Sequence, residues 1–278
     1  MPVDRRRARS YDLARTRGAL LAQTTALRTG IAALDADRLA RPTRSAGRTV
    51  SDLVAHLSLR LGSLAHELTL PEPPRAELTL AEWPPYSNSP YSNSSYSSFS
   101  YSGSLPGVVA GEAVAAAGED VIGAFGRAVE RFEEALAQVP AGDRPVATRP
   151  APMRLVDLLV TRCVEAVVHT DDLNDATGLE IPYDRQALAA ATRMLADALA
   201  AKAPGGAVEV RIPPFAVVQC GEGPRHTRGT PPNVVETDPL TWVRLATGRT
   251  DWATALGAAR VSASGERADL SQLLPVLG

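Results

Sequence analysis

The sequence predicts an α+β protein of two domains, because helical patterning fills the first part of the chain and strand patterning begins only after Gly206. With 278 residues, the chain is long enough to bury one large core or two modest ones. A Pro-Gly-Gly sequence at 204–206 separates the two patterns. We therefore predict a helical domain over 1–180 and a small α/β domain over 181–278, joined by a helix at about 184–203.

Five stretches have apolar residues at helical spacing: 11–35, about 50–70, about 108–138, 155–174 and about 184–203. Thr49 and Asp52 precede the second stretch as T-x-x-D, a pattern typical of a helix N-cap. Leucines then recur on one face of that helix until a proline cluster at 71–74 ends it. The first four stretches predict the helices of the first domain.

The segment at 86–104 fits neither domain. It reads YSNSPYSNSSYSSFSYSGS, with a tyrosine at every fifth position from Tyr86 to Tyr101. Because it contains too little aliphatic surface to offset the entropy of ordering, we expect a mobile loop. A lid with aromatic contacts over a pocket and a tolerated loop expansion are both compatible with this pattern.

The remainder of the chain alternates between short strand-like and helix-like patterns. Three β-branched segments at 207–214, 215–220 and 233–238 predict strands. Helices are then expected over 238–248 and 250–259, a strand over 260–265 and a last helix over 266–277.

Composition narrows the class of protein. The net charge is −2 and 22% of the residues are charged, which argues against nucleic acid as a general partner. No apolar run reaches the roughly 20 residues of a membrane span, and no signal peptide is evident. Two cysteines do not form a disulfide framework. We expect a cytoplasmic protein in a reducing compartment.

Glu165 and His169 lie four residues apart in the fourth predicted helix, so they share one face and could reach one metal ion. At an exposed position this spacing is usually a surface pair. Here apolar neighbours indicate burial, and a buried carboxylate needs a partner. His56, in the second predicted helix, could be a third ligand, or a core histidine with a hydrogen bond. Three ligands with an open fourth position are typical of catalytic zinc.

Neighbouring residues leave alternatives open. Arg162, three residues before Glu165, could pair with it or hold an anionic substrate. Asp171 and Asp172 could accept a hydrogen bond from a ligating imidazole, or could be solvated acids at a helix end. We expect Cys163 in the core because its position points away from Glu165.

Two stretches resemble a known family. RTVSDLVAHLSLRLGSL and TRCVEAVVHTDDL are similar to the two signatures of the mycothiol-dependent maleylpyruvate isomerase family. The resemblance implies a DinB-like four-helix bundle that holds a divalent metal, usually zinc, with nickel as the alternative. Carried over residue by residue, it makes His56, Glu165 and His169 the ligands. Arg48 stands where the family commonly has tryptophan.

The last hundred residues resemble a sterol-carrier-protein-like α/β domain, through ETDPLTWVRLATGRTDWATAL and RVSASGERADLSQLLPVL. Such a domain accompanies the bundle in many actinobacterial members. An actinobacterial origin agrees with the arginine-rich composition, because Lys202 is the single lysine among 29 basic residues.

These resemblances imply an isomerase or S-transferase. The thiol of mycothiol would add to a small, electrophilic, anionic substrate; expulsion of the thiol completes an isomerisation, and retention completes a transfer. The alternative is a sterol-carrier-like binding protein for an apolar ligand, with a structural or vestigial metal site. The metal triad discriminates between them, since a pure carrier does not require it, and structural zinc normally has four protein ligands.

Overall fold

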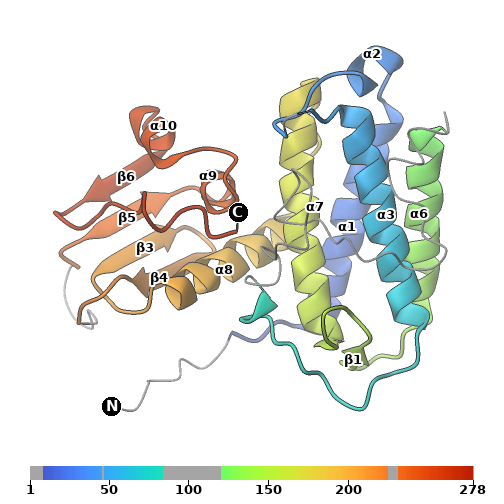
Figure 1. Ribbon diagram of the computed structural model, residues 1–278, viewed down its shortest axis with the longest axis horizontal. Coiled ribbons are helices and arrows are strands. Elements are labelled where there is room, and N and C mark those ends of the chain that lie inside the picture. The colour runs from blue at the N-terminus through green and yellow to red at the C-terminus, as the bar shows by residue number, and fades with distance from the viewer. Residues whose placement is uncertain (1–8, 46, 84–119, 225–230, 278) are drawn as a thin grey trace.

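The computed structural model describes residues 9–45, 47–83, 120–224 and 231–277. Long helices stand side by side in the N-terminal part, and a small sheet with its own helices forms the C-terminal part (Figure 1). The predicted loop at 86–104 and the first residues of the helix predicted at 108–138 lie outside the described residues.

Long helices form the N-terminal bundle (Figure 1). They are α1 (Leu13–Ala32), α3 (Val50–Thr69), α6 (Val121–Ala137) and α7 (Leu155–Thr177), with the short α2 (Ala36–Leu39) between α1 and α3. Thr49 and Asp52 form the predicted capping box at the start of α3: the Thr49 side chain accepts from the Asp52 N–H, and the Asp52 carboxylate accepts from the Thr49 N–H. A two-residue ladder of β1 (Pro145–Val146) and β2 (Met153–Arg154) leads into α7.

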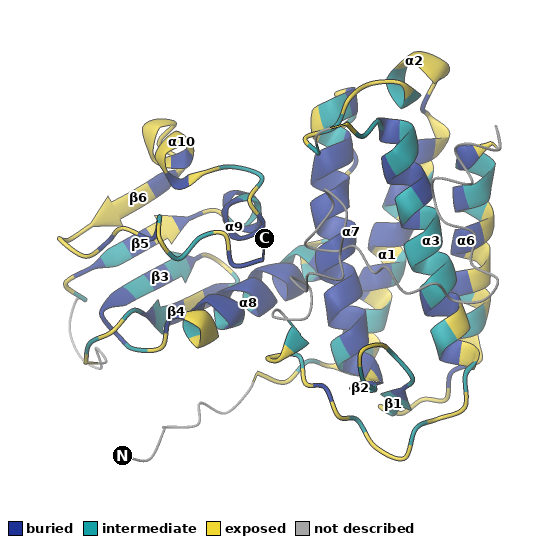
Figure 2. Cartoon of the chain, viewed as in Figure 1, coloured by how far each residue is buried: buried dark blue, intermediate teal, exposed yellow. Residues whose placement is uncertain are grey.

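Helix α7 is buried along almost its whole length (Figure 2). Nineteen of its 23 residues are buried, and they include Arg162, Glu165, His169, Asp171 and Asp172. Buried polar groups need hydrogen-bond partners, so these five side chains must find partners within α7 or on the elements around it.

The C-terminal sheet has the strand order β4-β3-β5-β6. Its strands are β3 (Val208–Ile212), β4 (Ala216–Cys220), β5 (Val234–Thr237) and β6 (Val261–Ser264). Strands β3 and β5 are parallel, and the two outer pairings are antiparallel. Helix α8 (Arg185–Lys202) contacts both α7 and β4, and α9 (Pro239–Ala246) and α10 (Trp252–Gly257) follow β5.

The helix predicted over 266–277 is wrong. This segment forms turns and extended chain, in which Leu270 and Leu277 are buried. Proline at position 275 cannot donate to a helical ladder, and the N–H groups of Val276 and Leu277 both donate to the carbonyl of Ala246, at the end of α9. The apolar residues that suggested a helix therefore anchor an extended segment onto α9.

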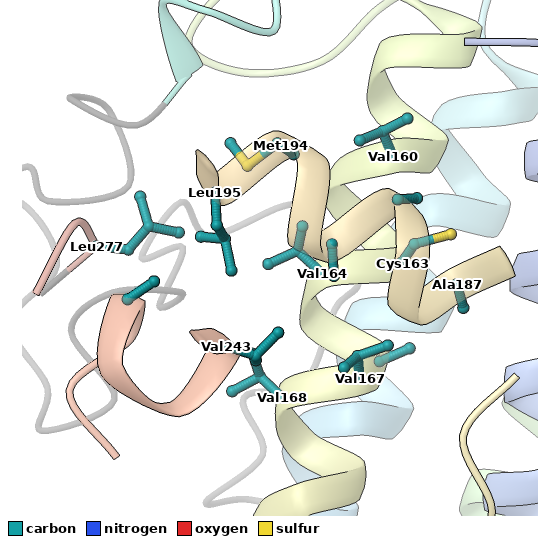
Figure 3. Packing of buried hydrophobic residues seen from close by; sticks show 14 of the residues in the cluster. Val160, Cys163, Val164, Val167, Val168, Ala187, Met194, Leu195, Val243 and Leu277 are labelled. Carbon is teal, nitrogen blue, oxygen red and sulfur yellow. The ribbon is translucent and has the colours of Figure 1, made fainter. Parts of the chain in front are cut away.

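Apolar side chains pack continuously from the bundle into the C-terminal part (Figure 3). Val164 and Val168 of α7 lie near Leu195 of α8, Val243 of α9 and Leu277 in that figure, and all five are buried. The boundary at 180/181 stays a prediction. Among the helices that the structure describes, none is long and apolar enough to cross a membrane.

Candidate functional site

The structure brings together two of the predicted ligands, His56 of α3 and His169 of α7. Their ring centroids are 5.2 Å apart and the ring planes meet at 77°. Burial lowers the pKa of His56 to about 3, and the neighbouring His169 and Arg60 act in the same direction. His56 is therefore a neutral imidazole at neutral pH, the form in which histidine binds metals.

Glu165, the third predicted ligand, is held by two arginines. Nη1 of Arg162 donates to both carboxylate oxygens at 2.7 and 2.8 Å, and Nη2 of Arg60 donates to Oε1 at 2.6 Å. Burial alone would raise the pKa of Glu165, but Arg162 and Arg60 outweigh it and lower the pKa to about 2. The carboxylate is ionised. Of the two roles considered for Arg162, the structure has the pairing with Glu165.

The three predicted ligands do not fit a metal ion as the side chains lie. Within residues 9–45, 47–83, 120–224 and 231–277, no group of three or more His, Cys, Asp or Glu residues is placed to hold one. The facing imidazoles have suitable chemistry, but both oxygens of Glu165 are engaged by arginines. The assignment of His56, Glu165 and His169 as metal ligands stays a prediction.

Asp172 contacts the Nδ1 side of the His169 ring. Its Oδ2 lies 3.2 Å from Nδ1 of His169, and Arg249 of the C-terminal part donates to Oδ2 at 3.1 Å. Burial would raise the pKa of Asp172, but hydrogen bonding to His169 and the charge of Arg249 hold it below its ordinary value. Because an ionised carboxylate only accepts, Nδ1 carries the hydrogen in the neutral ring, and the lone pair lies on Nε2.

Asp171 joins the two parts of the chain. Its side chain is 1% exposed and accepts from Arg44 at 2.6 Å, from Nη2 of Arg244 at 2.6 Å and from the hydroxyl of Tyr183 at 3.0 Å. Arg44 precedes α3, whereas Arg244 belongs to α9. Asp171 and Asp172 are therefore not solvated acids at a helix end, and only Asp172 contacts the imidazole.

The prediction that Cys163 lies in the core is confirmed. Cys163 is fully buried in the core, and burial raises the pKa of its thiol to about 12. The arginines that contact α7 were missed by the sequence analysis. Arg60 had a signal, because it lies four residues after His56 and hence on the same face of α3. Arg244 is 73 residues from Asp171, so local spacing gives no indication of that contact.

Comparisons with known proteins identify the family of this site. A family model described as the mycothiol maleylpyruvate isomerase N-terminal domain matches residues 20–174, more than half of the chain. The chain belongs to this family. A second model, described as a bacterial SCP ortholog, matches residues 184–276. No curated protein matches the chain.

Two solved structures support the fold. A crystal structure of the mycothiol-dependent maleylpyruvate isomerase superposes with a TM-score of 0.55, and one of its histidine-to-alanine mutants with 0.57. Both are 16% identical in sequence, and each alignment covers 93% of this chain and 95% of the other. The predicted α+β fold, with a helical N-terminal domain and a small C-terminal α/β domain, is confirmed.

Proposed function

We propose that this member of the mycothiol maleylpyruvate isomerase family is a thiol-dependent isomerase or S-transferase for a small, electrophilic, anionic substrate. The observation that carries the proposal is the arrangement between α3 and α7, where two facing imidazoles adjoin two arginines that share one ionised carboxylate. A further carboxyl group near Arg162, that of Glu67, has a pKa raised by burial. Arg60 and Arg162 place two positive charges beside the single ionised carboxylate of Glu165.

Positive charge favours the chemistry of a thiol. A nearby guanidinium lowers the pKa of a thiol and raises the fraction of thiolate, which is the nucleophile. The thiolate of mycothiol would add to an electrophilic carbon of the substrate, and its carbon–sulfur bond would break again after rotation in an isomerisation. Arg60, whose side chain is 16% exposed, would attract both the thiolate and a substrate carboxylate.

A thiol-dependence assay tests the proposal. Purified protein is supplied with mycothiol and a panel of cis-unsaturated dicarboxylic acids, maleylpyruvate included, and substrate loss is followed by absorbance and chromatography. We expect turnover that requires mycothiol and falls at least about 100-fold in His169→Ala. His66→Ala is the matched control, because His66 lies on the same helix α3 but is exposed. Turnover that is equal without thiol, or unaffected in His169→Ala, would contradict the proposal.

Metal binding at His56, Glu165 and His169 is a separate part of the proposal, with zinc expected and nickel as the alternative. Elemental mass spectrometry compares wild type, purified without a metal-affinity column, with His56→Ala and His169→Ala. About one zinc or nickel per chain in wild type, and none in either variant, is the expected result. A cytoplasmic location and the lack of a nucleic-acid partner also stay predictions.

The match of residues 184–276 to the bacterial SCP model supports the alternative function, a carrier of apolar ligands. Titration of the whole protein with a fluorescent fatty acid tests it. Saturable binding that is unchanged in His169→Ala, together with no thiol-dependent turnover, would favour the carrier.

A further inference from the structure

Arg60 occupies a particular position relative to the predicted metal ligands. It lies one helical turn after His56 on α3, and its guanidinium reaches across to Glu165 on α7, with Nη2–Oε1 at 2.6 Å and Nε–Oε2 at 3.4 Å. Its charge is also close enough to His56 to contribute to the lowered pKa of that ring. Arg60 therefore faces the same space between α3 and α7 as the two imidazoles.

The two arginines on Glu165 differ in how firmly they are held. Arg162 is on the same helix as Glu165, three residues before it, its side chain is 10% exposed, and Glu67 lies 3.8 Å from its guanidinium. Arg60 comes from the neighbouring helix, and its side chain is 16% exposed. Arg60 is thus the arginine that can leave Glu165 while the carboxylate keeps a partner.

A divalent cation at this site and the Arg60 guanidinium would both bind the carboxylate of Glu165. A metal ion bonded to this carboxylate and to both imidazoles would lie next to the guanidinium, and like charges repel strongly where water is largely excluded. We infer that the Arg60 guanidinium competes with a divalent cation for Glu165, so that metal binding requires Arg60 to turn away. This inference rests on the ligand set of the proposed function and adds a residue that controls its occupancy.

The competition makes a quantitative prediction for metal affinity. Arg60→Met keeps the apolar stem of the side chain and removes the charge, and Arg162 still pairs with both oxygens of Glu165. We expect zinc to bind at least about tenfold more tightly to this variant than to wild type, which corresponds to ~1.4 kcal/mol. Arg60→Lys retains the charge and should bind zinc much as wild type does.

The affinity is measured by competition with a chromophoric zinc chelator, and cobalt(II) added in place of zinc reports the ligand geometry through its visible absorption. Arg28→Met is the matched control, since Arg28 of α1 forms an exposed ion pair with Glu130 of α6. Adding His169→Ala to Arg60→Met should abolish the tight binding. Circular dichroism establishes that each variant is folded; if Arg60→Met is not, Arg60→Gln, which keeps a donor for Glu165 without the charge, replaces it.

The outcomes separate the inference from the proposal beneath it. If wild type and the uncharged variants bind one zinc equally tightly, and His169→Ala removes it, the ligand set stands and the competition is refuted. If none of them binds zinc or cobalt, the predicted ligand set fails, and the inference fails with it. Tighter binding in the uncharged variants, lost with His169→Ala, supports both.

Discussion

The contacts of Asp171 predict that its charge holds the C-terminal domain on the bundle. In Asp171→Asn, one carboxylate oxygen becomes an NH2 group that faces the donors of Arg44 and Arg244. The side chain of Asp171 is 1% exposed, whereas those of the two arginines are 25% and 36% exposed. Removal of one partner from a fully buried ion pair costs ~3–5 kcal/mol, but these arginines can turn towards water. Arg44 also retains Asp175, at 2.8 Å.

We therefore expect Asp171→Asn to destabilise the attachment of the C-terminal domain by about 2–3 kcal/mol. With a urea m-value of about 2 kcal/mol/M, the midpoint should fall by roughly 1–1.5 M. Two of the three tryptophans, Trp242 in α9 and Trp252 in α10, lie in the C-terminal domain, so tryptophan fluorescence in a Trp83→Phe background is a probe of that domain, while circular dichroism at 222 nm is dominated by the long helices. The fluorescence transition should shift more than the helical one.

Glu130→Gln is the control for this experiment, because it neutralises an exposed ion pair within the bundle. Such a pair contributes at most about 1 kcal/mol, so its midpoint should change little. If Asp171→Asn changed the fluorescence midpoint no more than Glu130→Gln does, the ion pairs of Asp171 would contribute nothing to domain attachment and the reasoning would be refuted.

Three further predictions concern stability and reactivity. The pKa of Glu165 in the folded protein is about 2, below its ordinary value of 4.5, so the stabilisation from its ionised form is complete above about pH 4.5 and is lost as the pH falls towards 2. Urea midpoints should therefore decrease as the pH is lowered from 7 to 3. An increase in the midpoint below pH 4.5 would be inconsistent with this reasoning. Gly205→Ala should destabilise the fold by about 2 kcal/mol or more, because φ is +137° there and the new methyl group would overlap the carbonyl of Gly221. Gly18→Ala, at an open position of α1, is the control and should be neutral or stabilising by up to ~1 kcal/mol. Thermal melting measures both effects. Cys163, buried and with a thiol pKa near 12, should resist iodoacetamide in the native state and react in urea, and peptide mass spectrometry showing fast native alkylation would contradict its burial.

Local patterns predicted the bundle well because its helices carry their own boundary signals. The capping box at Thr49 and Asp52 marks the start of α3 in both sequence and structure, and Gly178, left-handed with φ at 69°, ends α7 in the structure. The same reasoning failed at 266–277, where tertiary contacts to Ala246 determine the conformation and apolar spacing does not. Periodicity identifies buried side chains, but it does not specify which element buries them.

The candidate site was predictable only as far as helical spacing extends. Spacing placed Glu165 and His169 on one face, and the apolar surroundings of His56 indicated a packed histidine on a neighbouring helix, where the structure has it half-buried. The arginines on Asp171 and Asp172 come from segments distant in sequence, and no local rule pairs them with particular carboxylates. Arg60 is the exception among the missed arginines, because its spacing of four residues from His56 places it on the same face of α3 and could have indicated its contact with the site.

Asp171 and Asp172 connect the surroundings of His169 to the C-terminal domain, and neither domain provides these contacts by itself. The two carboxylates are adjacent on α7; Asp171 binds Arg244, while Asp172 binds both Arg249 and His169. Arg249 follows α9 in the C-terminal domain, so its contact with Asp172 on α7 depends on the docked C-terminal domain. Separation of the domains would leave Asp172 with His169 and the more distant Arg44, at 3.7 Å. The surroundings of His169 are therefore complete only when the two domains are in contact.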